Sequence, residues 1–295
     1  MKPLILFVLG ISTVPLCIRP LQAQVTTNVF ERVLDVRVNA DTPHAETATA
    51  FTLDVDGREY LITAKHVVAG LGDEGRIDIF INNNWKQLKV KIFRCADPVD
   101  IAVLIPPYQL TVAFPLSING GVYYGQEAYF LGFPFGIRTP ASGVNGPYPI
   151  ALIKRGTVSS IEKINPVGNA TRILLDGYNN PGFSGGPIVY RDMDKPGYVM
   201  GVIGVIAGFI PEVVPTMEKH DIPSPADASE TAKSQPWRIQ HRANGTWFEF
   251  VDTDKFVALN TGLVVGFGIQ PAIDLIRQHP IGPEAKNIRS NGFIQ

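Results

Sequence analysis

Apolar and polar residues alternate in short runs along most of the chain. Such runs predict half-buried β-strands, because successive side chains of a strand point to opposite faces of the sheet. A first set comprises residues 33–38, 47–54, 59–63, 77–81, 88–93 and 100–105, and a second set comprises residues 127–131, 150–161, 172–176, 187–190, 198–207 and 262–267. The pattern predicts an all-β protein made of two β units in series, joined by a Pro-rich and Gly-rich bridge over residues 106–125.

Three segments depart from this alternation or mark its turns. Asp56-Gly57, between two of the runs, is a hairpin signal, since Gly accepts the positive φ that tight turns require. Residues 271–277 (PAIDLIR) begin with Pro and place apolar residues at helical spacing, which predicts one short C-terminal helix. Residues 216–247 are rich in Pro, Ser, Ala and charged residues and are too polar for a core, so we expect a long surface insertion there.

Composition excludes several classes of protein. Hydrophobic residues make up 45% of the 295 residues and charged residues 18%, with a net charge of -1. A disordered chain would show lower hydrophobicity and a higher net charge, and a nucleic-acid-binding protein would show a basic excess. The 28 Gly and 24 Pro suit many short strands joined by tight turns.

The N-terminus has the pattern of a signal peptide. Lys2 precedes an apolar run over residues 3–17, and a polar stretch then ends at Ala23, so we expect cleavage after residue 23. This run is short for a membrane span, although an uncleaved anchor is the alternative. We expect a secreted or periplasmic protein without a membrane span after cleavage, with units at residues 24–115 and 116–280 and a tail at 281–295. Cleavage would leave Cys95 alone, as a buried small hydrophobe.

The sharpest chemical motif is residues 180–187, NPGFSGGP. Ser184 is flanked by glycines, where the backbone can bend tightly and approach a substrate. Such a loop can aim the N–H groups of Gly182 and Ser184 at one point beside the hydroxyl, which is the arrangement of an oxyanion hole. The alternative is a Gly-rich hairpin turn with an incidental Ser. A Ser alone is a poor nucleophile, so the catalytic interpretation also requires a His that acts as a base and an acid that orients this His.

His66 and Asp100 are the candidates for base and acid. His66 follows the apolar run Tyr60–Thr63, and Asp100 opens an otherwise apolar strand, where an ionised carboxylate needs a specific partner. Taken singly, a His is more often a surface or core residue, and an Asp before a strand is more often part of a turn.

Six stretches in order resemble the trypsin-like serine proteases, in particular the high-temperature-requirement branch. They are residues 61–68 (LITAKHVV), 97–104 (DPVDIAVL), 125–136 (GQEAYFLGFPFG), 154–159 (KRGTVS), 180–187 (NPGFSGGP) and 261–276 (TGLVVGFGIQPAIDLI). The resemblance implies two packed six-stranded antiparallel β-barrels with the cleft between them. It also implies that Ser184 is the nucleophile, that His66 is the general base and then the acid, and that Asp100 orients the imidazole. Only residues 278–295 follow the expected helix, too few for the PDZ domain usual in that branch.

The chain departs from the family at the specificity pocket and beside the nucleophile. Phe183 stands where the family usually has Asn or Asp, so we expect its bulky aromatic side chain to crowd the loop. In trypsin-type zymogens a freed N-terminus pairs with an Asp at this position, so we expect no activation by such cleavage here. Tyr178 stands where trypsin carries its Asp. With the apolar residues Ile206, Ala207 and Gly208 nearby, Tyr178 predicts a hydrophobic primary pocket and weak cleavage after Lys or Arg.

These residues predict an exported serine endopeptidase that acts on proteins or peptides through an acyl-enzyme. No cofactor or metal is expected, and no nucleic-acid partner. The sequence leaves the oligomeric state and the natural substrate open. The alternative is a protease-fold binding or scaffold protein of weak or absent activity.

Overall fold

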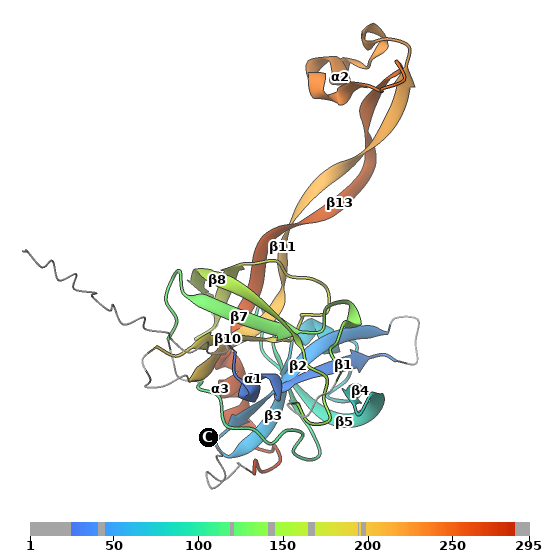
Figure 1. The fold of residues 1–295 in the computed structure, drawn as a ribbon. Helices are drawn as coiled ribbons and strands as arrows, with labels where there is room; N and C mark the ends of the chain where they lie inside the picture. The colour runs from blue at the N-terminus through green and yellow to red at the C-terminus, as the bar shows by residue number, and fades with distance from the viewer. Residues whose placement is uncertain are drawn as a thin grey trace, which may run out of the picture.

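The structure is a computed structural model that describes residues 25–40, 45–118, 121–140, 145–164, 169–193, 195 and 199–286. The expected signal peptide at residues 1–23 and residues 287–295 of the expected tail lie outside the described residues. Two β-barrels form the body of the molecule, and a long two-stranded arm rises from the second barrel (Figure 1).

The first barrel closes from six antiparallel strands in the spatial order β1-β2-β3-β6-β5-β4. The strands are β1 (Val33–Val38), β2 (Glu46–Val55), β3 (Arg58–Thr63), β4 (Glu74–Ile81), β5 (Asn84–Arg94) and β6 (Ala102–Ile105). Asp56 and Gly57 join β2 to β3 with φ values of 50° and 79°, which confirms the expected hairpin.

The second barrel closes in the order β11-β10-β7-β8-β9-β13, because β11 and β13 also pair with each other. Its strands are β7 (Glu127–Gly132), β8 (Leu152–Lys163), β9 (Thr171–Asp176), β10 (Pro187–Arg191), β11 (Met200–Ile222) and β13 (Trp247–Gly268); a seventh strand, β12 (Ile239–His241), adds to β13 outside the ring. The expected pair of six-stranded antiparallel barrels is therefore confirmed.

Each barrel has its own apolar core, and a third core lies between the barrels. The cores are built around Leu61 and Ile79 in the first barrel and around Phe130 and Ile188 in the second. Helix α3 (Gln270–Gln278) adds Ile273 and Ile276 to the third core, together with side chains of both barrels. The predicted C-terminal helix is thus confirmed, and its apolar face helps to hold the barrels together.

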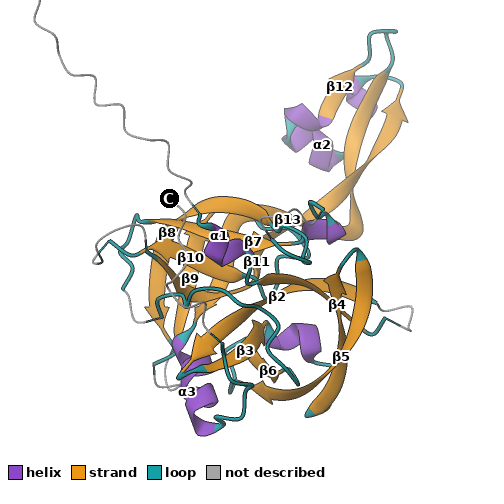
Figure 2. Cartoon of the chain, turned by 60° about the horizontal axis from the view of Figure 1, so that its bottom comes forward, coloured by secondary structure: helices purple, strands orange, loops and turns teal. Residues whose placement is uncertain are grey.

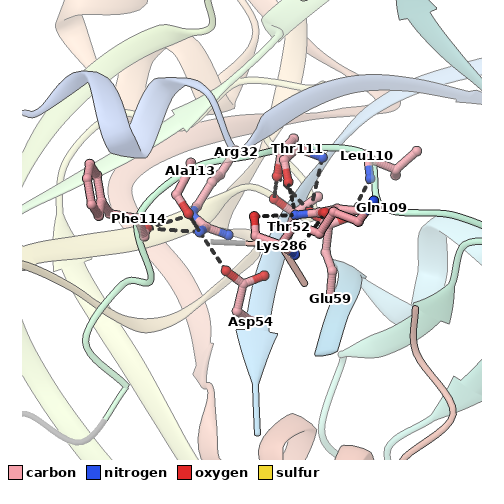
Figure 3. A network of polar contacts seen from close by, with 10 residues as sticks. All are labelled: Arg32, Thr52, Asp54, Glu59, Gln109, Leu110, Thr111, Ala113, Phe114 and Lys286. Atoms are coloured by element: carbon pink, nitrogen blue, oxygen red, sulfur yellow. Dashed lines mark hydrogen bonds and ion pairs between the residues drawn. The ribbon is translucent and has the colours of Figure 1, made fainter. Parts of the chain in front are cut away.

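The bridge between the barrels is fixed to the first barrel by a buried guanidinium (Figure 3). Arg32 is 1% exposed, and its Nη2 lies 2.8 Å from Asp54 Oδ2 and 2.8 Å from the carbonyl oxygens of both Ala113 and Phe114. A buried cation is stable only when it is paired and hydrogen-bonded, and these three acceptors supply that environment.

A buried carboxylate fixes the preceding residues of the bridge. The Glu59 side chain accepts hydrogen bonds from the backbone N–H groups of Leu110 and Thr111, at 2.5 and 3.1 Å, and from the Thr111 hydroxyl at 2.8 Å. Burial raises the pKa of Glu59, and these hydrogen bonds act in the opposite direction. Residues 110–114 are therefore attached to the first barrel at both ends of the segment.

The polar insertion is an ordered arm rather than a loop alone. Strands β11 and β13 continue beyond the barrel and stay paired from Pro211↔Asn260 to Ile222↔Trp247. At the tip lie two one-turn 3-10 helices, η3 (Pro225–Asp227) and η4 (Pro236–Arg238), together with α2 (Glu230–Ser234) and β12 (Figure 2). The strand pairing shifts register beside Pro211 and Pro215, and such bulges are where a sheet tolerates Pro, which has no N–H to donate to the ladder.

The remaining helical segments are short. They are α1 (Thr27–Phe30) at the start of the first barrel, η1 (Lys65–Val68) after β3 and η2 (Pro134–Gly136) after β7. No helix among the described residues has the length and apolar character needed to cross a membrane.

Replacing Arg32 with Met should lower the free energy of unfolding by about 3–5 kcal/mol, because Asp54 and the two bridge carbonyls lose their buried partner. Urea unfolding followed by tryptophan fluorescence measures the change. Arg172→Met is the matched control, since its partner Glu162 lies at the surface and the pair should contribute less than about 1 kcal/mol. Equal stability of the two variants would show that the Arg32 cluster does not hold the bridge.

Candidate active site

His66 and Asp100 meet at one end of the first barrel. Thr63 of β3 is the register partner of Ala102 of β6, so the residues just after β3 come beside those just before β6. His66 Nδ1 lies 2.6 Å from Asp100 Oδ2, and the His66 backbone N–H donates to Asp100 Oδ1 at 2.9 Å. The structure therefore brings together two of the residues that the sequence identified.

Asp100 is held in its charged form. Burial acts to raise the pKa of this carboxyl, but the side-chain hydrogen bond, the charge and the backbone N–H of His66 outweigh burial and lower the pKa below its ordinary value. An ionised carboxylate can only accept a hydrogen bond, so the proton between the two side chains belongs to His66 Nδ1. This tautomer leaves Nε2 of a neutral imidazole free of a proton and able to act as a base.

Ser184 lies in a loop whose glycines are required by close contacts. Gly182 has a φ of 103°, and a Cβ on it would lie 2.4 Å from the carbonyl oxygen of Phe133. Gly185 has a φ of 85°, and its Cβ would lie 2.1 Å from the carbonyl oxygen of Thr49 and 2.9 Å from the backbone nitrogen of Ala64. Because Ala64 is two residues before His66, the Ser184 loop packs directly on the segment that carries the imidazole.

Thr49 of the first barrel holds this loop, and the sequence analysis did not identify it. Thr49 is fully buried; its hydroxyl donates to the carbonyl oxygen of Gly182 at 2.7 Å and accepts from the N–H of Phe133 at 3.1 Å. Its backbone N–H donates to the Ser184 carbonyl at 3.0 Å. The only sequence signal is a polar residue between Ala48 and Ala50, whose side chains face the core of the first barrel.

The hydroxyl of Ser184 donates to the carbonyl oxygen of Ala207, at 3.3 Å. The neighbouring backbone is fixed by hydrogen bonds from Phe183 N to Asn180 O at 3.2 Å and from Gly185 N to Ile206 O at 2.8 Å. No described residue accepts a hydrogen bond from the N–H of Gly182 or of Ser184. These two donors are the pair that the sequence assigned to an oxyanion hole.

Phe183 was expected to crowd the loop beside Ser184, but the core of the second barrel accommodates its bulk. Its side chain is fully buried in the core of the second barrel, where it packs edge-on against Phe130 with ring centroids 5.2 Å apart. An aromatic ring needs no polar partner there, whereas a carboxylate would.

The residues expected at the specificity pocket differ in exposure. The side chain of Ile206 is fully buried in the core of the second barrel, Ala207 and Gly208 are half-buried, and Tyr178 is exposed. The structure thus places Ile206 behind the surface and leaves the other three accessible.

A cation lies beside this segment, and the sequence analysis did not assign it to the site. Lys154 Nζ donates to the Tyr178 carbonyl at 2.6 Å and to Asn180 Oδ1 at 2.5 Å, and lies 5.7 Å from the Tyr178 ring centroid. Burial lowers the pKa of Lys154.

The described residues offer little support for a cysteine nucleophile or a metal site. Cys95 is buried, and burial raises the pKa of its thiol to about 12, so it is a poor nucleophile, as expected. The described residues contain no group of three or more His, Cys, Asp or Glu side chains placed to hold a metal ion.

The chain was compared with protein families, curated proteins and solved structures. The family described as trypsin-like peptidase domain matches residues 48–202. No curated protein matches the chain. Among solved structures, the HtrA-type protease AlgW with tripeptide is similar at 15% identity and a TM-score of 0.49, over 85% of this chain and 61% of that chain. The inactive form of Rv3671c from M. tuberculosis is similar at 17% identity and a TM-score of 0.40, over 79% of this chain and 83% of that chain.

The family match has the greatest weight. It spans more than half of this chain and contains His66, Asp100 and Ser184. By that match, the chain belongs to the trypsin-like peptidase domain family.

Proposed function

We propose that the protein is an exported serine endopeptidase whose catalytic residues are His66, Asp100 and Ser184. The observation that carries the proposal is the 2.6 Å contact between His66 Nδ1 and Asp100 Oδ2, beside a Ser184 loop that packs on the same segment. Family membership supports the reaction class.

In this mechanism, the base and the nucleophile come from different barrels. His66 Nε2 takes the hydroxyl proton as Ser184 Oγ attacks the scissile carbonyl, and then gives the proton to the leaving amine. Water later attacks the acyl-enzyme by the same route. Asp100 keeps the imidazole in the required tautomer and stabilises the imidazolium. Before attack, the Ser184 hydroxyl must turn from the Ala207 carbonyl towards His66.

The N–H groups of Gly182 and Ser184 form the oxyanion hole in this proposal. Both are without a described acceptor, so both can donate to the negative oxygen of the tetrahedral intermediate. Export rests on the pattern of residues 1–23, which predicts a cleaved signal peptide and a secreted or periplasmic protein.

The substrates proposed are proteins or peptides with a hydrophobic residue at the cleavage position. Ala207, whose carbonyl accepts from Ser184, and its neighbour Gly208 are uncharged and half-buried, and Tyr178, six residues before Ser184, is exposed. The Lys154 ammonium lies next to Tyr178, and a like charge would repel the side chain of a Lys or Arg substrate.

A second candidate is a binding or scaffold protein that keeps the protease fold. The hydrogen bond from the Ser184 hydroxyl to the Ala207 carbonyl favours it, because a hydroxyl held there is turned to a carbonyl rather than to a base. Reaction with a fluorophosphonate probe separates the two functions, since only an activated Ser attacks the phosphorus.

Ser184→Ala should abolish fluorophosphonate labelling and lower kcat for peptide hydrolysis by at least about a thousandfold, because the nucleophile is removed. Ser159→Ala, at an exposed serine of β8, is the control and should keep full activity. If Ser184→Ala still cleaves at the wild-type rate, the assignment is wrong.

Thr49→Val should lower kcat by about tenfold or more, because the Gly182 carbonyl and the Phe133 N–H lose their partner and each unpaired buried group costs about 1–3 kcal/mol. Thr49→Ser keeps the hydroxyl and should recover most of the activity. Steady-state kinetics on a short peptide measure both variants. An unchanged kcat for Thr49→Val would show that the hydrogen bonds of the Thr49 hydroxyl do not position the proposed oxyanion donors.

Wild-type enzyme should cleave a peptide panel best after large apolar residues and least after Lys or Arg. Lys154→Met should raise kcat/KM for Arg substrates by several-fold relative to Leu substrates, since the repelling charge is gone. Lys163→Met, at the far end of the same strand, is the control. Preferred cleavage after Arg by the wild type would contradict the proposed pocket.

A further inference from the structure

Strand β11 runs without interruption from the candidate cleft into the arm. Its residue Ile206 exchanges backbone hydrogen bonds with Gly185 and Gly186, and the carbonyl of Ala207 accepts from Ser184. β11 pairs with β13 first within the barrel, from Gly204, and then along the arm, from Pro211. Ser184 therefore contacts the strand that continues out of the body into the arm (Figure 1).

The root of the arm presents an uncharged surface that is apolar except for Asn260, and we name it face A. Residues that oppose each other in a β-ladder share a face, so the pairs Pro211↔Asn260, Val213↔Ala258 and Pro215↔Phe256 lie on one side of the ribbon. The Val213 and Phe256 side chains are 62% and 66% exposed. The opposite side carries Glu212, Val214, Val257 and Leu259.

A ribbon of two strands has no second layer to cover these side chains. Exposed apolar side chains mark an interaction site when nothing in the fold requires them there. Face A carries the most exposed ones, because Val257 and Leu259 on the opposite side are 42% and 45% exposed and share that side with Glu212. Recognition at face A is by side chains and not by strand addition, because Pro211 and Pro215 have no N–H to donate to an added chain.

We propose that face A binds apolar residues of a polypeptide substrate while the same chain occupies the cleft. This inference rests on the proposed function. Continuity of β11 with Ala207 and Ser184 favours the substrate as the occupant. The size of face A also favours it: a stable dimer needs about 20–30 residues a side, and face A offers only the six residues of three pairs.

The length of a substrate determines whether it can occupy the site at Ser184 and face A at the same time. Val213 is six residues beyond Ala207, or roughly 20 Å along a strand. An extended substrate spans at most about 3.5 Å per residue, so about six residues must separate the cleaved position from the apolar anchor. Short peptides cannot reach face A, whereas unfolded proteins can.

Binding is measured in the Ser184→Ala background, which removes cleavage. The face A variant is Val213→Ser with Phe256→Ser, and the matched control is Val257→Ser with Leu259→Ser on the opposite side. Fluorescein-labelled β-casein, an unfolded polypeptide, should bind the face A variant about tenfold more weakly by fluorescence anisotropy, because two apolar contacts are lost. The control should bind within twofold of the parent.

Hydrolysis provides the second readout. With Ser184 restored, the face A variant should show a higher KM for β-casein and an unchanged kcat/KM for a tetrapeptide. Equal casein affinity in all three proteins would overturn the inference, as would an equal loss in the face A variant and the control. A wild-type dimer that becomes monomeric only in the face A variant, by sedimentation, would make a second copy the occupant and overturn it too. Failure of the wild type to cleave either substrate would refute the proposed function, while the binding result would still decide the role of face A.

Discussion

The candidate site depends on one polar interlock between the barrels. Thr49 of the first barrel hydrogen-bonds through its hydroxyl to Gly182 and Phe133 of the second, and through its backbone N–H to Ser184. Since His66 and Asp100 belong to the first barrel and Ser184 to the second, no single barrel contains the chemistry. Thr49 itself is fully buried, so its polar groups would be costly to leave unpaired if the barrels moved apart. The glycine at 185 is part of the same constraint, because any larger residue would push the Ser184 loop away from Ala64.

Two buried charges restrict the bridge and thereby support this interlock. Arg32 and Glu59 both come from the first barrel, and both use bridge backbone groups as partners. Buried charges add little net stability compared with apolar residues, but their partners are strongly specified. Their effect here is to fix where residues 110–114 lie, so that the second barrel starts from a defined position. Helix α3 closes the arrangement from the other end of the chain, through Ile273 and Ile276.

Much of this arrangement follows from the sequence, and the exceptions have physical reasons. Alternation identified the barrel strands because each has one face in a core. The contexts of His66, Asp100 and Ser184 pointed to the candidate site because the proposed chemistry requires local sequence signals. Thr49 escaped detection because its partners lie more than 80 residues away. Residues 216–247 were expected to be a surface insertion because they are too polar for a core, but their strand pairing was not foreseen, because a ribbon exposed on both sides needs no alternation. Phe183 was expected to crowd its own loop because the sequence does not show that its side chain points into the core of the second barrel.

The arm and the candidate site are also joined by a direct contact, which makes the arm part of the cleft's support. Asn260, at the root of β13, donates a side-chain hydrogen bond to the carbonyl of Asn179, and Gly177 N–H donates to Gly262 O at 2.8 Å. Asn179 is buried and precedes the turn that carries Gly182 and Ser184. The segment that leads to Gly182 is therefore held from the arm by these hydrogen bonds and from the first barrel by Thr49. Attachment at both sides of this turn suits the oxyanion hole proposed for Gly182 and Ser184, because the donors of such a hole must not reorganise as charge develops.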